Sequence, residues 1–327
     1  MKDLIRSLVE TTGPSGYEHN VREVVREAVT PYADEITVDA LGNLIARKGS
    51  GGKKIMISAH MDEIGVIVTH VDKNGFARFT NIGGVLPKHC VGSHVRFLNG
   101  ASGVVYSEGT AFYESPPLAK MYIDTGATSP KDSPVQIGDV ASFSREFLDL
   151  GKRLASKAMD DRVGVAVGIE ALRRLKDSPN EVYFVFSVQE EVGLRGATTS
   201  AYGVDPDLGI ALDVTMTGDQ PQGVKMEVKL GDGAAIKVRD GGMLADPRVV
   251  EWMVDTAKKE KITYQMEVLE GGTTDARAIQ LTRAGVPSGC ISIPTRYIHS
   301  PSEMVDLDDV EACIRLLVAL LEQDIDW

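Results

Sequence analysis

The chain has 327 residues, of which 43% are hydrophobic and 25% are charged, as in ordinary globular proteins. Its formal net charge of -12 argues against a surface that binds nucleic acid. No apolar stretch approaches the roughly 20 residues that a membrane-spanning helix needs. The length is sufficient for two domains. We therefore expect a globular protein that binds neither nucleic acid nor membranes.

The three cysteines are an odd number and show no paired spacing; they are Cys90, Cys290 and Cys313. A framework of disulfide bonds is therefore not expected, and a reducing cytoplasm is the location that fits best. Free cysteine usually behaves as a small buried apolar side chain, and we expect this of all three.

The first 60 residues predict two helices followed by three strands. A helix at the N-terminus is broken by the glycine- and proline-rich turn at 13–16, and apolar residues at helical spacing resume over 20–29. Short strands are expected at 35–39 and 44–48. After a glycine-rich turn at 49–52, a third strand ends at His60.

The segment from about residue 65 to about residue 153 contains many short alternating runs and no helix of convincing length. Glycine, proline and asparagine punctuate these runs. Such a pattern is typical of a small β-barrel or β-sandwich. The expected strands lie at 65–71, 76–82, 93–97, 103–107, 120–123 and 140–143.

Beyond residue 157, predicted strands alternate with predicted helices, which is typical of an α/β sheet with helices on both faces. The expected strands are 182–188, 208–213, 234–238, 263–268 and 288–293, and the expected helices are 161–175, 197–202, 247–261, 274–284 and 307–323. The fold class is therefore α/β, with a central mixed, mostly parallel sheet flanked by helices and an inserted small all-β domain. The α/β domain is expected to be discontinuous, 1–66 and 153–327, and the inserted β-barrel to cover 67–152.

Histidines and acidic residues stand at or just after the ends of the predicted strands. His60 ends one strand, Glu190 and Glu191 follow another, Asp213 ends a third, and His299 follows a fourth. Ligands of open α/β sheets bind beyond the carboxyl ends of the strands. We therefore expect these side chains to converge at one edge of the sheet.

Asp160 stands at a loop-to-helix junction, where the helix N-terminus tolerates negative charge. Taken alone, Asp160 could be a helix cap, and Asp213 could cap a turn. The joint placement of all these residues at one edge favours a shared role. Charged side chains at buried strand ends are costly unless something pairs with them, and two divalent metal ions would pair with all of them. The pattern therefore points to a two-metal hydrolase.

At these residues the chain resembles the tetrahedral aminopeptidases, co-catalytic metallopeptidases that assemble into hollow dodecamers. The similarity runs nearly end to end, includes the inserted domain, and rests on motifs that occur in the same order. These motifs are 58–65 (SAHMDEIG), 156–162 (SKAMDDR), 188–193 (VQEEVG), 211–214 (ALDV), 271–276 (GGTTDA) and 294–301 (PTRYIHSP).

The resemblance implies a zinc-peptidase-like fold that holds two divalent metal ions per subunit, zinc or cobalt. One ion would be held by His60, Asp160 and Asp213. The other would be held by Asp160, Glu191 and His299, so that Asp160 bridges the two. Imidazole with carboxylate ligands suits zinc or cobalt better than magnesium.

The resemblance also implies the roles of the neighbouring residues. Glu190 would be the general base, and Asp62 would hold the His60 ring by its free N–H, as metal-bound histidines generally require. The peptide bond between Asp160 and Asp161 would be cis. The implied activity is the removal of N-terminal residues from short peptides.

The chemistry of this ligand set can be followed from the residues. Three ligand carboxylates and two divalent ions together leave one positive charge, which favours a metal-bridging hydroxide. Metal binding also lowers the pKa of water to about 7. Glu190 and Glu191 are adjacent on the predicted strand, so their side chains should point to opposite sides. One can then bind metal while the other moves a proton. The turn at 271–275 either caps a helix or contacts substrate.

Two other enzyme classes remain open from the residues. An endoglucanase-type glycoside hydrolase uses paired carboxylates as acid and base, but that chemistry does not need His60 or His299. A di-metal deacylase or carboxypeptidase keeps the same metals. The preferred N-terminal residue and the native metal are not readable. By the resemblance, the assembly is expected to be a homo-oligomer, with dimers formed through the inserted β-barrel and combined into a tetrahedral dodecamer.

Overall fold

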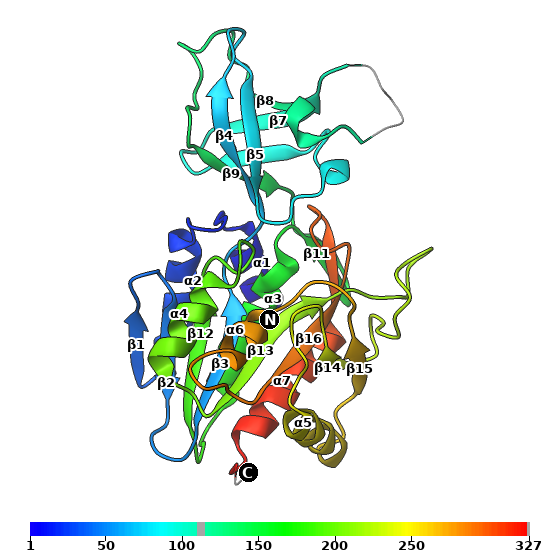
Figure 1. Cartoon of the computed structure of the whole chain (residues 1–327). Helices are drawn as coiled ribbons and strands as arrows, with labels where there is room; N and C mark the ends of the chain where they lie inside the picture. Colours follow the sequence, from blue (N-terminus) through cyan, green and yellow to red (C-terminus); the bar gives the residue numbers. More distant parts are fainter. Residues whose placement is uncertain (110–114, 326–327) are drawn as a thin grey trace.

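The computed structural model describes residues 1–109 and 115–325, and Figure 1 shows its two parts. The larger part is an 11-stranded sheet covered by helices. The smaller part is a closed barrel, which stands above the edge of the sheet where β3 (Lys54–His60) ends. No helix in the described ranges is long and apolar enough to cross a membrane.

The sheet has a parallel centre and antiparallel flanks. In the centre β12 (Glu181–Ser187), β3, β13 (Leu208–Thr215) and β16 (Ser288–Arg296) run parallel. The outer strands are β1 (Glu35–Val38), β2 (Leu44–Lys48), β10 (Leu148–Leu150), β11 (Arg153–Ser156), β14 (Ala234–Arg239), β15 (Tyr264–Val268) and β17 (Glu303–Asp306). Except for the parallel pair β14 and β15, they join by antiparallel pairing. The prediction of a mixed sheet is confirmed, but "mostly parallel" holds only for the centre.

Helices cover both faces of the sheet, as the alternating pattern predicts. One face is covered by α1 (Lys2–Glu10), α2 (His19–Val29), α3 (Met159–Arg174), α5 (Pro247–Lys259) and α7 (Leu307–Leu321), whose apolar residues form one large core with the sheet. The other face is covered by α4 (Arg195–Val204) and α6 (Asp275–Gln280). α3 is buried along most of its length, so its apolar residues contact both the sheet and α7.

The barrel consists of six antiparallel strands, each within a few residues of an expected strand. They are β4 (Gly65–Val71), β5 (Ala77–Ile82), β6 (His94–Phe97), β7 (Ser102–Ser107), β8 (Met121–Asp124) and β9 (Val140–Ser144). Alternate residues of these strands point inward and form a separate apolar core. The assignment of 67–152 to a dimerisation domain stays a prediction, and its range includes residues 110–114, which lie outside the described residues.

The structure differs from the expectations in three short strands and one helix end. The strands β10, β11 and β17 were not predicted, because segments of three or four residues are too short to give a clear period-2 signal and pair only once the chain has folded. The helix expected at 274–284 ends at Gln280, because Leu281 leaves the helical conformation and Arg283 has a positive φ of 50°. All three cysteines are free and buried, as expected.

Arg162 ties the N-terminal segment to α3. Its side chain is fully buried and it donates hydrogen bonds to four backbone carbonyls, those of Leu8, Thr11, Gly13 and Met61. Its guanidinium also lies 3.4 Å from Glu63. A single buried cation thus satisfies carbonyls from α1, from the following loop and from the end of β3.

Replacing Arg162 with Met should lower the free energy of unfolding by about 3–5 kcal/mol, because it leaves four buried carbonyls without this donor and removes one of the two buried cations beside Glu63, the other being Lys157. Chemical denaturation followed by circular dichroism measures this. The control is Arg173→Met, since Arg173 makes an ion pair with Glu170 at the surface and lies over the Tyr32 ring. A surface ion pair contributes about 0–1 kcal/mol, and an exposed contact between a cation and a ring about 0.5–1 kcal/mol. Equal losses in both variants would contradict the role given to Arg162.

Candidate metal centre

The parallel centre of the sheet brings four strand ends to one edge, the edge below the barrel (Figure 1). His60 is the last residue of β3, and Asp213 lies near the end of β13. Glu190 and Glu191 follow β12, and His299 follows β16. The predicted convergence of these residues is therefore confirmed, and its cause is the common direction of the central strands.

Asp160 lies between the two histidines. It sits in the first turn of α3 with a non-helical ψ of 107°, and the Asp160–Asp161 peptide bond is cis, as the resemblance implies. One carboxylate oxygen, Oδ1, is 3.1 Å from His60 Nε2. The other oxygen, Oδ2, is 3.4 Å from His299 Nε2. The two oxygens of one carboxylate thus face two different imidazoles.

Each histidine has a further carboxylate beside it. Asp213 Oδ1 lies 3.9 Å from His60 Nε2, and Glu191 Oε2 lies 3.4 Å from His299 Nε2. Within each group of three, the potential ligand atoms all lie within 4.8 Å of one another. The groups are His60, Asp160, Asp213 and Asp160, Glu191, His299, the same two sets that the resemblance implies.

Asp62 fixes two parts of this centre at once. Its Oδ1 lies 3.4 Å from His60 Nδ1, and its backbone oxygen lies 3.2 Å from the same ring nitrogen. The carboxylate also accepts the backbone N–H groups of Glu190 and Glu191 at 2.9 and 3.2 Å, and the Ser15 hydroxyl at 2.6 Å. Asp62 therefore orients the His60 ring and also the turn that carries both glutamates.

A turn, and not the alternation of a strand, directs the side chains of Glu190 and Glu191 to different neighbours. The strand β12 ends at Ser187, and Gln189 adopts a positive φ of 56°. Glu190 Oε2 lies 3.8 Å from His60 Nε2, whereas Glu191 faces His299. The expectation that the residues lie on a strand was wrong, because the strand ends before them and the turn sets their directions.

The electrostatics of the centre fit the binding of cations. Burial, together with the charge of Asp213, raises the pKa of Glu190 well above its usual value, and burial beside Asp160 raises that of Asp213. The same causes bring the pKa of Glu191 to about 7. Burial also opposes ionisation of Asp160, but hydrogen bonds from His299 and His60 more than offset it, and the pKa of Asp160 is lowered.

The candidate ligands therefore contain more carboxylates than positively charged groups that could balance them. Two divalent ions would supply that charge, and a mixture of imidazole nitrogen and carboxylate oxygen suits zinc or cobalt. The residues present thus fit the metal ions that the sequence predicts.

Two supporting carboxylates were missed by the sequence analysis. Glu303, on β17, accepts the backbone N–H of Asp160 at 3.0 Å and that of His299 at 2.8 Å. Asp275 accepts hydroxyl hydrogens from Ser58 and Ser187, both at 2.6 Å. Asp275 belongs to the GGTTDA motif, which gave a signal, but nothing local marks Glu303, because its strand forms only by tertiary pairing.

The turn at 271–275 serves as a cap and also as a cavity wall. The Thr274 side chain accepts the backbone N–H of Ala276 at the start of α6, which confirms the cap. Gly272, Thr273 and Thr274 line the cavity beside the candidate ligands.

The cavity at the centre has a volume of about 490 Å³. The barrel contributes to it through Leu86 and through the neighbouring Gly84, which lies against His299. A Cβ at Gly84 would lie 2.4 Å from the His299 ring, so only glycine permits this approach. The site is therefore shaped by both parts of the molecule.

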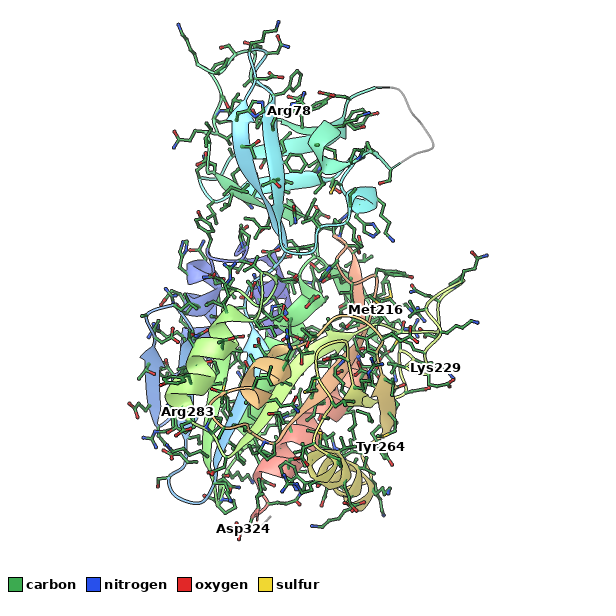
Figure 2. All side chains as sticks on the ribbon, viewed as in Figure 1. Arg78, Met216, Lys229, Tyr264, Arg283 and Asp324 are labelled. Carbon is green, nitrogen blue, oxygen red and sulfur yellow. The ribbon has the colours of Figure 1, made fainter. Side chains whose placement is uncertain are left out.

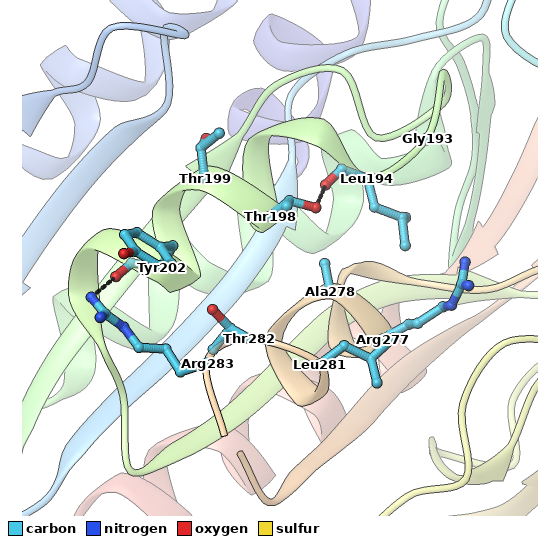
Figure 3. Close-up of a pocket in the computed structure, with 10 residues that line it drawn as sticks. All are labelled: Gly193, Leu194, Thr198, Thr199, Tyr202, Arg277, Ala278, Leu281, Thr282 and Arg283. Atoms are coloured by element: carbon cyan, nitrogen blue, oxygen red, sulfur yellow. Dashed lines mark hydrogen bonds between the residues drawn. The ribbon is translucent and has the colours of Figure 1, made fainter. Parts of the chain in front are cut away.

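A second, larger groove of about 590 Å³ runs between α4 and α6, and Figure 3 shows its lining residues. It contains none of the candidate metal ligands, but it shares Gly193, Leu194 and Arg277 with the catalytic cavity. The candidate metal ligands therefore lie in the smaller cavity, and the groove is continuous with its mouth.

Residues 42–316 match the model of the M42 glutamyl aminopeptidase family. The chain belongs to this family. It is accordingly an aminopeptidase, a hydrolase that acts on peptide bonds, and dependence on metal is typical of the family. The resemblance stated from the motifs is thereby confirmed.

Relatives match over nearly the whole length of the chain. A protein of Acetivibrio thermocellus is 49% identical over 97% of each chain. The lysyl aminopeptidase of Pyrococcus furiosus is 36% identical over 98% of this chain and 96% of its own length.

Solved structures share the fold at similar coverage. An aminopeptidase of Desulfurococcus kamchatkensis superposes with a TM-score of 0.95 at 43% identity, covering 98% of this chain and 94% of its own. The TET1 peptidase of Pyrococcus horikoshii gives a TM-score of 0.88 at 32% identity, over 98% of this chain and 99% of its own. A Thermotoga maritima protein named endoglucanase gives 0.82 at 34% identity, over 97% and 96%.

Replacing Asp62 with Asn should lower metal affinity or turnover about 10–100-fold. The amide NH₂ group of Asn would face a donor whose hydrogen bond the Asp62 carboxylate now accepts. Metal titration and steady-state kinetics of the purified variant measure both quantities. Asp255→Asn serves as the control, since Asp255 lies on the surface of α5. Wild-type affinity and turnover in the Asp62 variant would show that the ring and the turn do not need its charge.

Proposed function

We propose that the chain is a two-metal aminopeptidase that removes N-terminal residues from short peptides. The observation that supports this best is the position of Asp160, whose two oxygens face His60, at the end of β3, and His299, in the loop after β16. In this proposal Asp160 would help to hold both divalent ions. Asp213 completes one ligand set and Glu191 completes the other.

The metals proposed are zinc or cobalt, two per subunit, on the basis of the imidazole and carboxylate donors. When bound, they supply Lewis acidity that brings the pKa of water toward neutrality and polarises the scissile carbonyl. The protein contributes the positions of the ligands, which Asp62 and Glu303 hold through backbone N–H groups.

Glu190 is proposed as the general base. It belongs to neither group of three, yet it lines the cavity and its carboxylate lies 3.8 Å from His60. Burial raises its pKa, which makes a carboxylate better able to accept and hold a proton. In this role it takes a proton from the attacking water and passes it to the leaving amine.

The other enzyme classes are separable by simple tests. A glycoside hydrolase, the class suggested by the name of the Thermotoga maritima protein, needs two carboxylates but not two histidines, and its activity should survive a chelator. A di-metal deacylase or carboxypeptidase should accept peptides with a blocked N-terminus, which an aminopeptidase should not hydrolyse.

The proposed assembly is a homo-oligomer in which dimers form through the barrel. The TET1 peptidase of Pyrococcus horikoshii assembles into a tetrahedron or a large octahedral shell, and a related TET1 structure is a dodecamer. The barrel of this chain exposes several large apolar side chains. Large exposed apolar patches are rare on monomeric proteins and often mark a contact with another subunit. These side chains of the barrel are Leu86, Val91, Val104, Tyr106 and Ile137.

Glu190→Gln should keep both metals but lose about 10²–10⁴-fold in kcat, because the amide cannot accept the proton. Metal analysis and hydrolysis of aminoacyl amides are measured on the same sample. His60→Ala and His299→Ala should instead lower the metal content. Glu27→Gln, a change of the same kind on the exposed side of α2, should leave both unchanged. Near wild-type turnover in Glu190→Gln would remove this residue from its role.

The native mass should be twelve times the 35.3 kDa of one chain, as measured by light scattering. Ile137→Asp should split the assembly at the barrel, because it places a charge in a dehydrated contact. Leu281→Asp, at a similarly exposed leucine on the α6 side, should leave barrel-mediated dimers intact. A monomeric wild type, or an intact assembly with Asp at position 137, would contradict the proposed contact.

A further inference from the structure

Apart from the candidate ligands, the residues that line the catalytic cavity include two cations. Lys237, on β14, is fully buried in the cavity wall. Arg277, on α6, is exposed at the mouth that the cavity shares with the groove of Figure 3. Exposed charges are screened by water, whereas a buried charge acts on whatever enters the cavity. Lys237 is therefore the cation that decides which side chains the interior accepts.

Lys237 is paired with a buried carboxylate. The parallel register of β14 and β15 sets Lys237 opposite Glu267, and the lysine Nζ donates to Glu267 Oε1. Glu267 is also fully buried, and the same oxygen accepts the Thr215 hydroxyl at 2.6 Å. The lysine and the glutamate together bring no net charge to the wall.

Lys237 is held in its charged form. Burial alone would favour the neutral amine, but the neighbouring Glu267 more than offsets it, and the pKa of Lys237 is raised. The second oxygen of Glu267, Oε2, has no hydrogen-bond partner among the described residues. Glu267 therefore depends on Lys237 and Thr215 for its stabilisation, and the lysine is not available to a second carboxylate.

Apart from the candidate metal centre, the two cations and three threonines, the side chains of the wall are apolar; the threonines are Thr215, Thr273 and Thr274. Met216, labelled in Figure 2, follows β13 and lines the cavity together with other apolar side chains. These are Leu86, Leu194, Val214, Leu269 and Ile298. A charged side chain of a substrate that enters the cavity loses its hydration and finds no unpaired buried charge in return. An apolar side chain is stabilised by the burial of its surface.

We propose that the Lys237–Glu267 pair makes the cavity select uncharged, apolar N-terminal residues, such as leucine and methionine, over acidic ones. This inference rests on the proposed aminopeptidase function of the same site. An unpaired lysine in this wall would attract the carboxylate of an N-terminal glutamate or aspartate. In this chain Glu267 already occupies that position, so the substrate class differs from the one in the name of the family model.

The test measures kcat/KM for leucyl, methionyl, glutamyl and lysyl chromogenic amides with metal-loaded protein. Wild type should hydrolyse the leucyl and methionyl amides at least about tenfold better than the glutamyl amide. Glu267→Gln leaves the charge of Lys237 uncompensated and should raise the glutamyl-to-leucyl ratio about tenfold. The double variant K237M/E267Q removes both charges and should return the ratio to that of wild type.

Ratios are compared within each variant, so an equal effect on metal binding or turnover cancels. A wild type that prefers glutamyl over leucyl amide would overturn the inference, and this result does not depend on any variant folding. An unchanged ratio in Glu267→Gln, with the melting temperature retained, would overturn the pair as the cause. Failure of every aminoacyl amide would overturn the proposed function instead.

Discussion

Mutual repulsion of buried carboxylates is the constraint on which the rest of this structure depends. The central strands and the start of α3 bring acidic side chains to one edge of the sheet, where burial raises the pKa of most of them; they are Asp160, Asp161, Glu190, Glu191 and Asp213. Only two imidazoles lie among them. Such a cluster is stable only with added positive charge or added protons. The pair of divalent ions proposed above would meet that need and would also give the site its chemistry.

The surroundings of the cluster consist largely of carboxylates that accept backbone N–H groups. Asp62 holds the turn at Glu190 and Glu191, and Glu303 holds Asp160 and His299. Asp161 accepts the backbone N–H of His60 at 3.2 Å. These contacts fix the main chain at each candidate ligand and leave the ligand side chains directed to the centre. Such preorganisation is what metal-dependent catalysis requires of a protein.

The cavity divides into a chemical part and a selecting part. The ligands come from the ends of the central strands, whereas Lys237 and Glu267 come from β14 and β15 at the side of the sheet. In the functions proposed above, the charge of the first part binds metal, and the neutrality of the second part selects the substrate side chain. The barrel closes the cavity through Leu86 and Gly84. The fold can therefore vary selectivity without changing its ligands.

Apolar periodicity in the sequence alone determined the α/β class and the six barrel strands, and polar residues at the strand ends marked the edge where the site lies. The choice of five candidate ligands came from the resemblance of the motifs to a known family. The sequence did not determine β17 or the role of Glu303, since that strand has no local signal and exists only through pairing with β11 and β16. Nor did it reveal the Lys237–Glu267 pair, because 30 residues separate the two and only the register of β14 with β15 joins them. Local pattern fixes which residues are buried, while the partners of a buried charge are decided by strand order and register.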